Sequence, residues 1–210
     1  MISFLHLSKN NTMNDFLFYL ELGCTHVLDI KAYDHILFLI VLVVSFSFKQ
    51  WKNMLWLVSL FTLGHTISLA LSAYKIIYVA GDLVEFLIPL TIFITAINNM
   101  LTGGKNTSNS KLLLFLSFCF GWIHGLGFSN YFKMLISGLD AKLLPLIEFS
   151  LGIELAQIII VIVIVALYHL LTPIFKISKR DWIVVISSII LGITIPMLME
   201  RYDGFIKHLL

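Results

Sequence analysis

Histidines and carboxylates recur within the apolar runs of this chain. An ionisable side chain within a bilayer costs at least about 2.5 kcal/mol even on the mildest scale, so it is retained where something binds it. When apolar runs are treated as helices of alternating direction, these residues fall roughly 5–15 Å below one surface. A shared polar cavity explains this coincidence better than separate hydrogen bonds do. The residues are Asp34, His35, His65, Glu85, His124, Glu154 and Gln157.

The residue types favour a divalent transition-metal ion. Neutral imidazole binds zinc, nickel, cobalt and copper, and carboxylates compensate the metal charge or orient the ring tautomer. A proton relay built from the same groups is the competing interpretation. No catalytic residue and no organic cofactor is assigned. The expected metal ligands are His26, Asp34, His35, His65, His124 and Glu154, with Glu85 and Gln157 supporting them.

Spacing along the chain predicts how these side chains point. Glu154 and Gln157 are three residues apart and share a helix face, whereas the neighbours Asp34 and His35 diverge by about 100°. On an unbroken helix His26 would point about 180° away from His35. We therefore expect a bend near residues 29–32 that folds His26 over the site. The alternative is that His26 is an interfacial side chain in water.

Glycines beside the polar residues predict close helix contacts. Gly121 and Gly125 form a GxxxG face around His124, and small residues let a neighbouring helix approach closely. Gly64 beside His65 and Gly152 near Glu154 repeat this pairing of a small and a polar residue.

The composition predicts an all-α integral membrane protein. Hydrophobic residues make up 59% of the 210 residues, charged residues only 12%, and mean hydropathy is +0.97. A crossing helix needs about 20 apolar residues, so the whole chain, 1–210, is expected to form a single transmembrane domain. Residues 13–25 predict a short interfacial helix before the first span. The six expected spans are residues 31–48, 53–73, 82–101, 112–136, 145–171 and 182–199.

Charge predicts the partners and the orientation. The net charge of +2 is too small, and the basic residues too scattered, for a nucleic-acid partner. Three loops after the first, third and fifth spans carry basic residues without acids before Asp181. Since orientation follows Lys and Arg in short loops, we place these loops in the cytoplasm and both termini outside. Lipid and a metal ion are the expected partners, and self-association is left open.

Five ordered motifs resemble the HupE/UreJ family of bacterial membrane proteins. The resemblance covers about residues 26–160 and leaves out the sixth span. Seven residues separate His26 from the Asp-His pair where the family usually has five. Gly64, His65 and Thr66 replace a common Ala-His-Ser, and Ser150 replaces a frequent asparagine. The motifs are "H-x7-DHILFL" at 26–39, "FTLGHTISL" at 61–69, "LVEFLIPLTI" at 83–92, "GWIHGLGF" at 121–128 and "LGIELAQ" at 151–157.

The resemblance implies a permease for Ni²⁺ or Co²⁺ in the bacterial inner membrane, and the departures from the usual motifs indicate a divergent branch, for which a different substrate is left open. The expected metal is therefore Ni²⁺, Co²⁺ or Zn²⁺. The alternative function is an intramembrane zinc metalloenzyme, a hydrolase or acyl transferase acting on a lipid or a membrane-anchored peptide. In that enzyme three histidines hold zinc, and Glu154 or Asp34 serves as the general base.

Overall fold

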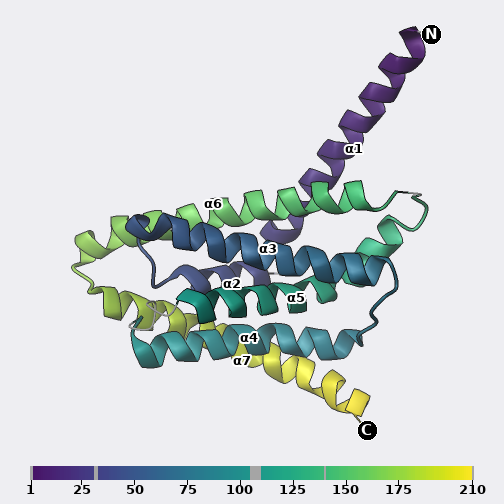
Figure 1. The fold of residues 1–210 in the computed structure, drawn as a ribbon. Helices are drawn as coiled ribbons and strands as arrows, with labels where there is room; N and C mark the ends of the chain where they lie inside the picture. The colour runs from purple at the N-terminus through teal and green to yellow at the C-terminus, as the bar shows by residue number, and fades with distance from the viewer. Residues whose placement is uncertain (1, 31–32, 105–109, 140, 210) are drawn as a thin grey trace.

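The computed structural model describes residues 2–30, 33–104, 110–139 and 141–209, and within them every regular element is a helix. This confirms the all-α class (Figure 1). The helices are α1 (Ile2–Leu28), α2 (Asp34–Val43), the 3-10 helix η2 (Phe48–Gln50), α3 (Trp51–Ala73), α4 (Gly81–Thr102), α5 (Ser110–Leu135), α6 (Leu143–Phe175) and α7 (Lys179–Leu209).

Five of these helices, α3 to α7, are long and apolar enough to cross a membrane, which indicates a multi-pass membrane protein. Their ends follow from local chemistry. Helix α4, for example, ends at Gly103, whose φ of 55° is a left-handed conformation that costs glycine little.

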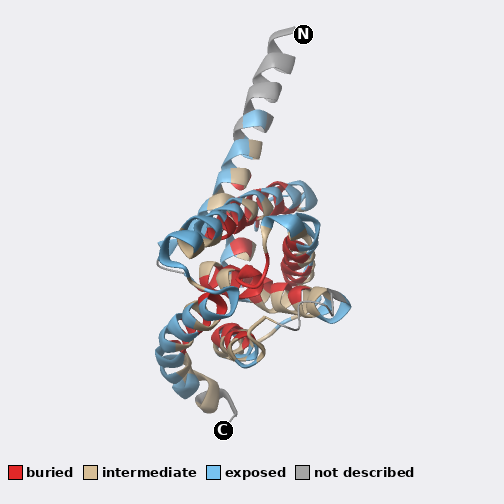
Figure 2. Ribbon diagram, turned by 90° about the vertical axis from the view of Figure 1, so that its left-hand side faces the viewer, coloured by how far each residue is buried: buried red, intermediate tan, exposed pale blue. Residues whose placement is uncertain are grey.

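Helix α2 corrects the first expected span, 31–48. It has ten residues, about 15 Å of helix against about 30 Å of hydrocarbon. Residues 31 and 32 lie outside the described part of the chain. Most of α2 is buried among the other helices. Figure 2 shows that buried residues gather at the centre of the bundle and exposed ones on its outside. Its apolar sequence therefore reflects burial inside protein rather than length across lipid. The helix expected over 13–25 is part of α1 and continues to Leu28.

The helices pack in pairs, of which α3 with α5 is the most extensive. A Cβ atom at Gly121 would overlap the carbonyl of Phe61, and one at Gly125 would overlap the carbonyl of His65. Gly64 meets the backbone of α5 in the same way. The expected close approach at the GxxxG face is confirmed, and it brings the backbone of His65 against α5 beside His124.

Helix α1 packs on α6 through a second glycine pair, Gly23 and Gly152, each of which lies against the other helix's backbone. The Cys24 thiol donates a hydrogen bond of 3.2 Å to the Gly152 carbonyl. Burial raises the pKa of this thiol, which keeps the proton on sulfur for the donation. This contact fixes the last turn of α1, which carries His26.

Candidate metal centre

Three histidines from three helices converge inside the bundle. His26 lies in the last turn of α1, His35 in the first turn of α2, and His65 within α3. One ligand atom from each lies within 4.8 Å of the other two. A single ion can contact atoms this close with small adjustments of the rings, because metal–nitrogen bonds are about 2.0–2.1 Å long. We call His26, His35 and His65 the histidine cluster.

A break in the helix makes this convergence possible. Helix α1 ends at Leu28 and α2 begins at Asp34, so the chain changes course within the segment where a bend was expected. The ring centroids of His26 and His35 are 4.7 Å apart. On a continuous helix the two rings would lie on opposite faces. The seven intervening residues therefore do not keep His26 away from His35.

The ring nitrogens of the cluster are buried and lack hydrogen-bond partners. These atoms are Nε2 of His26, Nε2 of His35 and both ring nitrogens of His65. His65 is completely buried. Each buried polar atom left unpaired costs about 1–3 kcal/mol. A concentration of such atoms at one point is what an imidazole metal site requires of the protein, because the ligand lone pairs must remain available.

Asp34 orients one ring of the cluster. Its Oδ1 lies 3.0 Å from Nδ1 of His35 and accepts a second bond of 2.8 Å from the His35 backbone N–H. A carboxylate can only accept, so Nδ1 carries the proton and Nε2 keeps its lone pair for a ligand bond. This is the carboxylate–histidine arrangement that supports many metal sites. The adjacent residues thus have different roles: Asp34 orients the ring, and His35 offers the ligand nitrogen.

His124 lies next to the cluster without being among its three converging atoms. Its ring centroid is 5.1 Å from that of His35. Nδ1 donates to the Phe120 carbonyl at 2.8 Å, which leaves Nε2 deprotonated, and that atom is buried without a partner. His124 is thus prepared chemically as a fourth nitrogen ligand.

Aromatic rings enclose the cluster. Phe128 lies 3.9 Å from His26 between ring centroids, and it stacks on Phe149 at 5.2 Å. Phe61 packs against His35 and His124 on another side. These apolar walls exclude water from the rings and strengthen any charge interaction within them.

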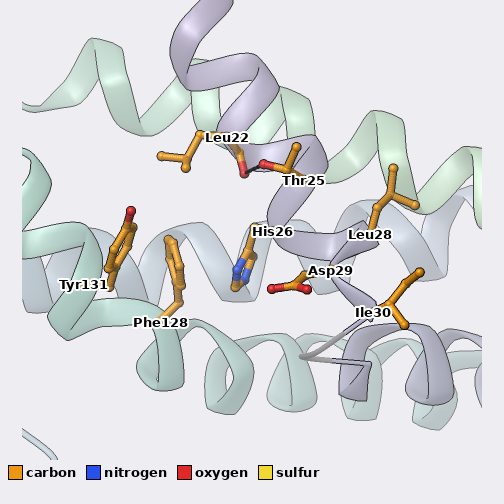
Figure 3. A pocket seen from close by; sticks show the side chains of 8 residues that line it. All are labelled: Leu22, Thr25, His26, Leu28, Asp29, Ile30, Phe128 and Tyr131. Atoms are coloured by element: carbon orange, nitrogen blue, oxygen red, sulfur yellow. Dashed lines mark hydrogen bonds between the residues drawn. The ribbon is translucent and has the colours of Figure 1, made fainter.

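A pocket of about 660 Å³ leads from the surface to His26. Figure 3 shows the His26 ring and the Asp29 carboxylate among the side chains around this space, which come from α1, from residues 29 and 30 just after it, and from α5. Thr25 and Tyr131 add hydroxyl groups at its walls. His35 and His65 do not line it, so His26 is the member of the cluster that a solute in this pocket meets.

Glu154 and Gln157 both hydrogen-bond to α3. Ser59 donates to Glu154 Oε1 at 2.5 Å, and Thr62 donates to Gln157 Oε1 at 2.9 Å. Ser59 lies six residues before His65, about 9 Å away along α3. The two α6 residues therefore form a polar layer on the η2 side of the histidine cluster. The Nε2 atom of Gln157 is buried there without a partner.

Glu85 lies apart from the histidine cluster. It is exposed and lines a pocket between α4 and α7, and Arg201 donates to its backbone carbonyl at 2.9 Å. Its neighbours Val84 and Ile88 face Gly127 of α5, so Glu85, one residue on from Val84, points about 100° away. The α4–α7 pocket is defined here by Asp82, Glu85, Glu200 and Arg201.

Sequence reasoning missed two hydroxyl residues of this site. Ser59 and Thr62 hold Glu154 and Gln157 and lie six and three residues before His65. The repeat of polar residues at three-residue intervals on an apolar helix was the available signal, because such residues share one face.

Comparison with known proteins places the chain in a family. A family model described as HupE / UreJ protein matches residues 5–201. The chain belongs to the HupE/UreJ family. The match extends beyond the five motifs and includes most of α7, which the motif resemblance had left out. Membership of the HupE/UreJ family implies a nickel or cobalt transporter-like role. Comparison with curated protein sequences and with solved structures finds no match.

Proposed function

We propose that this chain is a permease that carries a divalent transition-metal ion, Ni²⁺ or Co²⁺, across the bacterial inner membrane. The histidine cluster is the observation that carries the proposal: three imidazoles from three helices converge within 4.8 Å, and their buried nitrogens have no protein partner. Membership of the HupE/UreJ family supports the same role.

The ligand set suits a transition-metal ion that binds imidazole nitrogens and must be released again during transport. His26, His35 and His65 supply neutral nitrogen ligands, and His124 supplies a fourth when its ring moves towards the ion. Asp34 contributes a negative charge through His35. A site of neutral imidazoles with one carboxylate behind them binds a divalent cation without a rigid cage of charges, which favours exchange over permanent retention.

The metal ion enters from the outer side through the pocket that His26 lines. The other end of the bundle carries Lys49 of η2, Lys52 of α3, and Lys179 with Arg180 at the start of α7, and we assign that end to the cytoplasm. The ion first meets His26, the ring that lines the pocket, and then passes to His35 and His65. Glu154 and Gln157 of α6 contact α3 farther towards the cytoplasmic end, on the same path of the ion.

The test is metal uptake into proteoliposomes that contain the purified protein and a metal-quenched dye. His65→Ala removes the fully buried ligand and is expected to abolish protein-dependent uptake of Ni²⁺ and Co²⁺. His169→Ala is the matched control, because His169 lies on α6 outside the cluster and hydrogen-bonds its own helix at Val165. Equal uptake by both variants would refute the permease site.

A second candidate is the intramembrane zinc metalloenzyme. The observation that favours it is the wide pocket beside three histidines, which would admit a water and a lipid or peptide substrate. Elemental analysis of the purified protein together with the flux assay separates the two. Stoichiometric, tightly held zinc without any flux supports the enzyme, whereas exchangeable metal with flux supports the permease.

A further inference from the structure

A small polar pocket lies at the opposite end of α2 from the histidine cluster. It has a volume of about 40 Å³, several times what one water requires. Its polar lining comes from the turn after α2 and from one face of α4. These residues are Ser45, Thr95, Asn98, Asn99 and Thr102. No Lys, Arg or His is among the described residues that line it.

Several oxygen atoms of this pocket have lone pairs to offer. Thr95 donates to the Thr91 carbonyl and Thr102 to the Asn98 carbonyl, each at 2.7 Å. Asn99 donates through Nδ2 to the Val41 carbonyl of α2. These bonds use both threonine protons and one Asn99 amide proton, so the threonine hydroxyl oxygens act as acceptors towards the pocket, together with Oδ1 of Asn98 and Asn99. The pocket therefore presents oxygen acceptors beside the amide protons of Asn98.

The Ser45 hydroxyl is the independent sign of a ligand. Ser45 is 3% exposed, lines the pocket, and has no hydrogen-bond partner. A buried hydroxyl in a protein ordinarily donates to an acceptor, as Ser117 does here to the Leu57 carbonyl of a neighbouring helix. A buried hydroxyl without such a bond costs about 1–3 kcal/mol unless something else in the pocket binds it.

The carboxyl end of α2 adds a negative electrostatic potential, which favours a cation. Helix α2 ends at Val43, and the carboxyl end of a helix carries a partial negative charge of about 0.5. Discontinuous helices in transporters use such ends, together with backbone and side-chain oxygens, to hold cations. A ten-residue helix separates the two ends by about 15 Å.

We propose that this pocket is a second cation site, on the inward side of the histidine cluster, which holds an ion through neutral oxygens at the carboxyl end of α2. The inference rests on the permease proposal. Neutral oxygens without a carboxylate bind weakly, as a site that must release its ion requires. The ion is either the transported divalent metal in transit or a monovalent cation that moves with it.

The first test compares Ser45→Ala with Ser188→Ala, a serine on α7 that is exposed and lies outside this pocket. Loss of one oxygen ligand to a cation is expected to lower Ni²⁺ uptake into proteoliposomes about tenfold. Equilibrium Ni²⁺ binding in detergent stays within about twofold of the wild type, because the histidine cluster is intact. Ser188→Ala leaves both values unchanged. Wild-type uptake by Ser45→Ala would overturn the proposal.

Repeating the uptake with Na⁺ replaced by choline identifies the ion. If Ser45→Ala removes a Na⁺ dependence that the wild type shows, the site holds the monovalent ion. If uptake by the wild type is independent of Na⁺ and Ser45→Ala still lowers it, the site holds the metal in transit.

The second test distinguishes a failure of the second cation site from a failure of the permease function. In a Cys24→Ser, Cys119→Ser background, sided vesicles that carry Ser45→Cys or Thr25→Cys are treated on one face with Ag⁺, and the thiols left unreacted are counted after unfolding. Ag⁺ is a thiol-reactive cation small enough for a pocket of about 40 Å³. The two thiols are expected to react from opposite faces, and Ni²⁺ or Na⁺ protects Ser45→Cys. Absence of wild-type uptake alone refutes the permease. Labelling of both thiols from one face, or no protection by either cation, refutes the second site.

Discussion

The histidine cluster and the α4–α7 pocket place ionisable groups at similar expected depth, yet they differ in every property that matters for a metal. In the cluster, buried nitrogens point at one another without hydrogen-bond partners. In the α4–α7 pocket, the acids Asp82, Glu85 and Glu200 are exposed, and Arg201 lines the same space. Exposed carboxylates stay hydrated, and the charge of the arginine disfavours a metal cation beside it. The depth of ionisable side chains in the membrane therefore does not define a metal site by itself. The side chains must also point at one another and be buried from water.

The largest expected effect comes from separating the helices that form the cluster. Gly121→Leu places a side chain against the backbone of α3 at Phe61 and is expected to destabilise the fold by about 3 kcal/mol or more. The Tm in detergent then falls by about 6 °C or more. Gly192→Leu on α7 has open space at its Cβ and leaves the Tm within about 1 °C. Equal shifts in both variants would contradict the glycine contact.

The next effect contrasts a carboxylate from each region. Asp34→Asn removes the charge behind His35 and the acceptor that fixes its tautomer, so Ni²⁺ affinity is expected to fall about 10–100-fold. Glu85→Gln changes the affinity less than about twofold, because Glu85 does not contact the cluster. Calorimetric titration of both variants measures the contrast. A larger loss in Glu85→Gln would reverse the assignment.

Acid tests the desolvation that separates the cluster from the α4–α7 pocket. Metal bound to imidazoles competes with protons only near and below the imidazole pKa. Burial lowers the pKa of His26, in the last turn of α1, well below the ordinary value of about 6.5. Affinity for Ni²⁺ is therefore expected to stay constant from about pH 8 to about 6.5 and to fall only at lower pH. Calorimetric titration across this range measures the profile, and a fall of about tenfold between about pH 8 and 6.5 would contradict buried, neutral imidazoles.

The smallest effect concerns the polar layer beneath the cluster. Thr62→Val removes the hydrogen bond to Gln157, and such bonds in membranes average about 0.6 kcal/mol. The Tm is expected to fall by about 2 °C. Thr172→Val is the control, because Thr172 bonds only to its own helix at Tyr168. A larger fall in the control would show that the interhelical bond adds nothing.

The sequence was sufficient for the fold class, the family and the need for a bend before α2. Composition and run length determine the first, and helical periodicity shows that His26 cannot join His35 without a break. It could not determine the length of α2, because a buried helix and a lipid-facing helix are equally apolar. The sequence also could not exclude Glu85 from the site. The position of a residue along its helix can be derived from the sequence, but the neighbouring helix that its side chain faces cannot.

The central claim is that imidazoles from α1, α2 and α3 bind one ion. X-ray absorption at the metal edge of the purified protein loaded with one equivalent of Ni²⁺ tests this most directly. We expect a shell with at least three imidazole ligands, which loses one in His65→Ala and none in His169→Ala. A shell made of oxygen alone, or one that is identical in both variants, would contradict it.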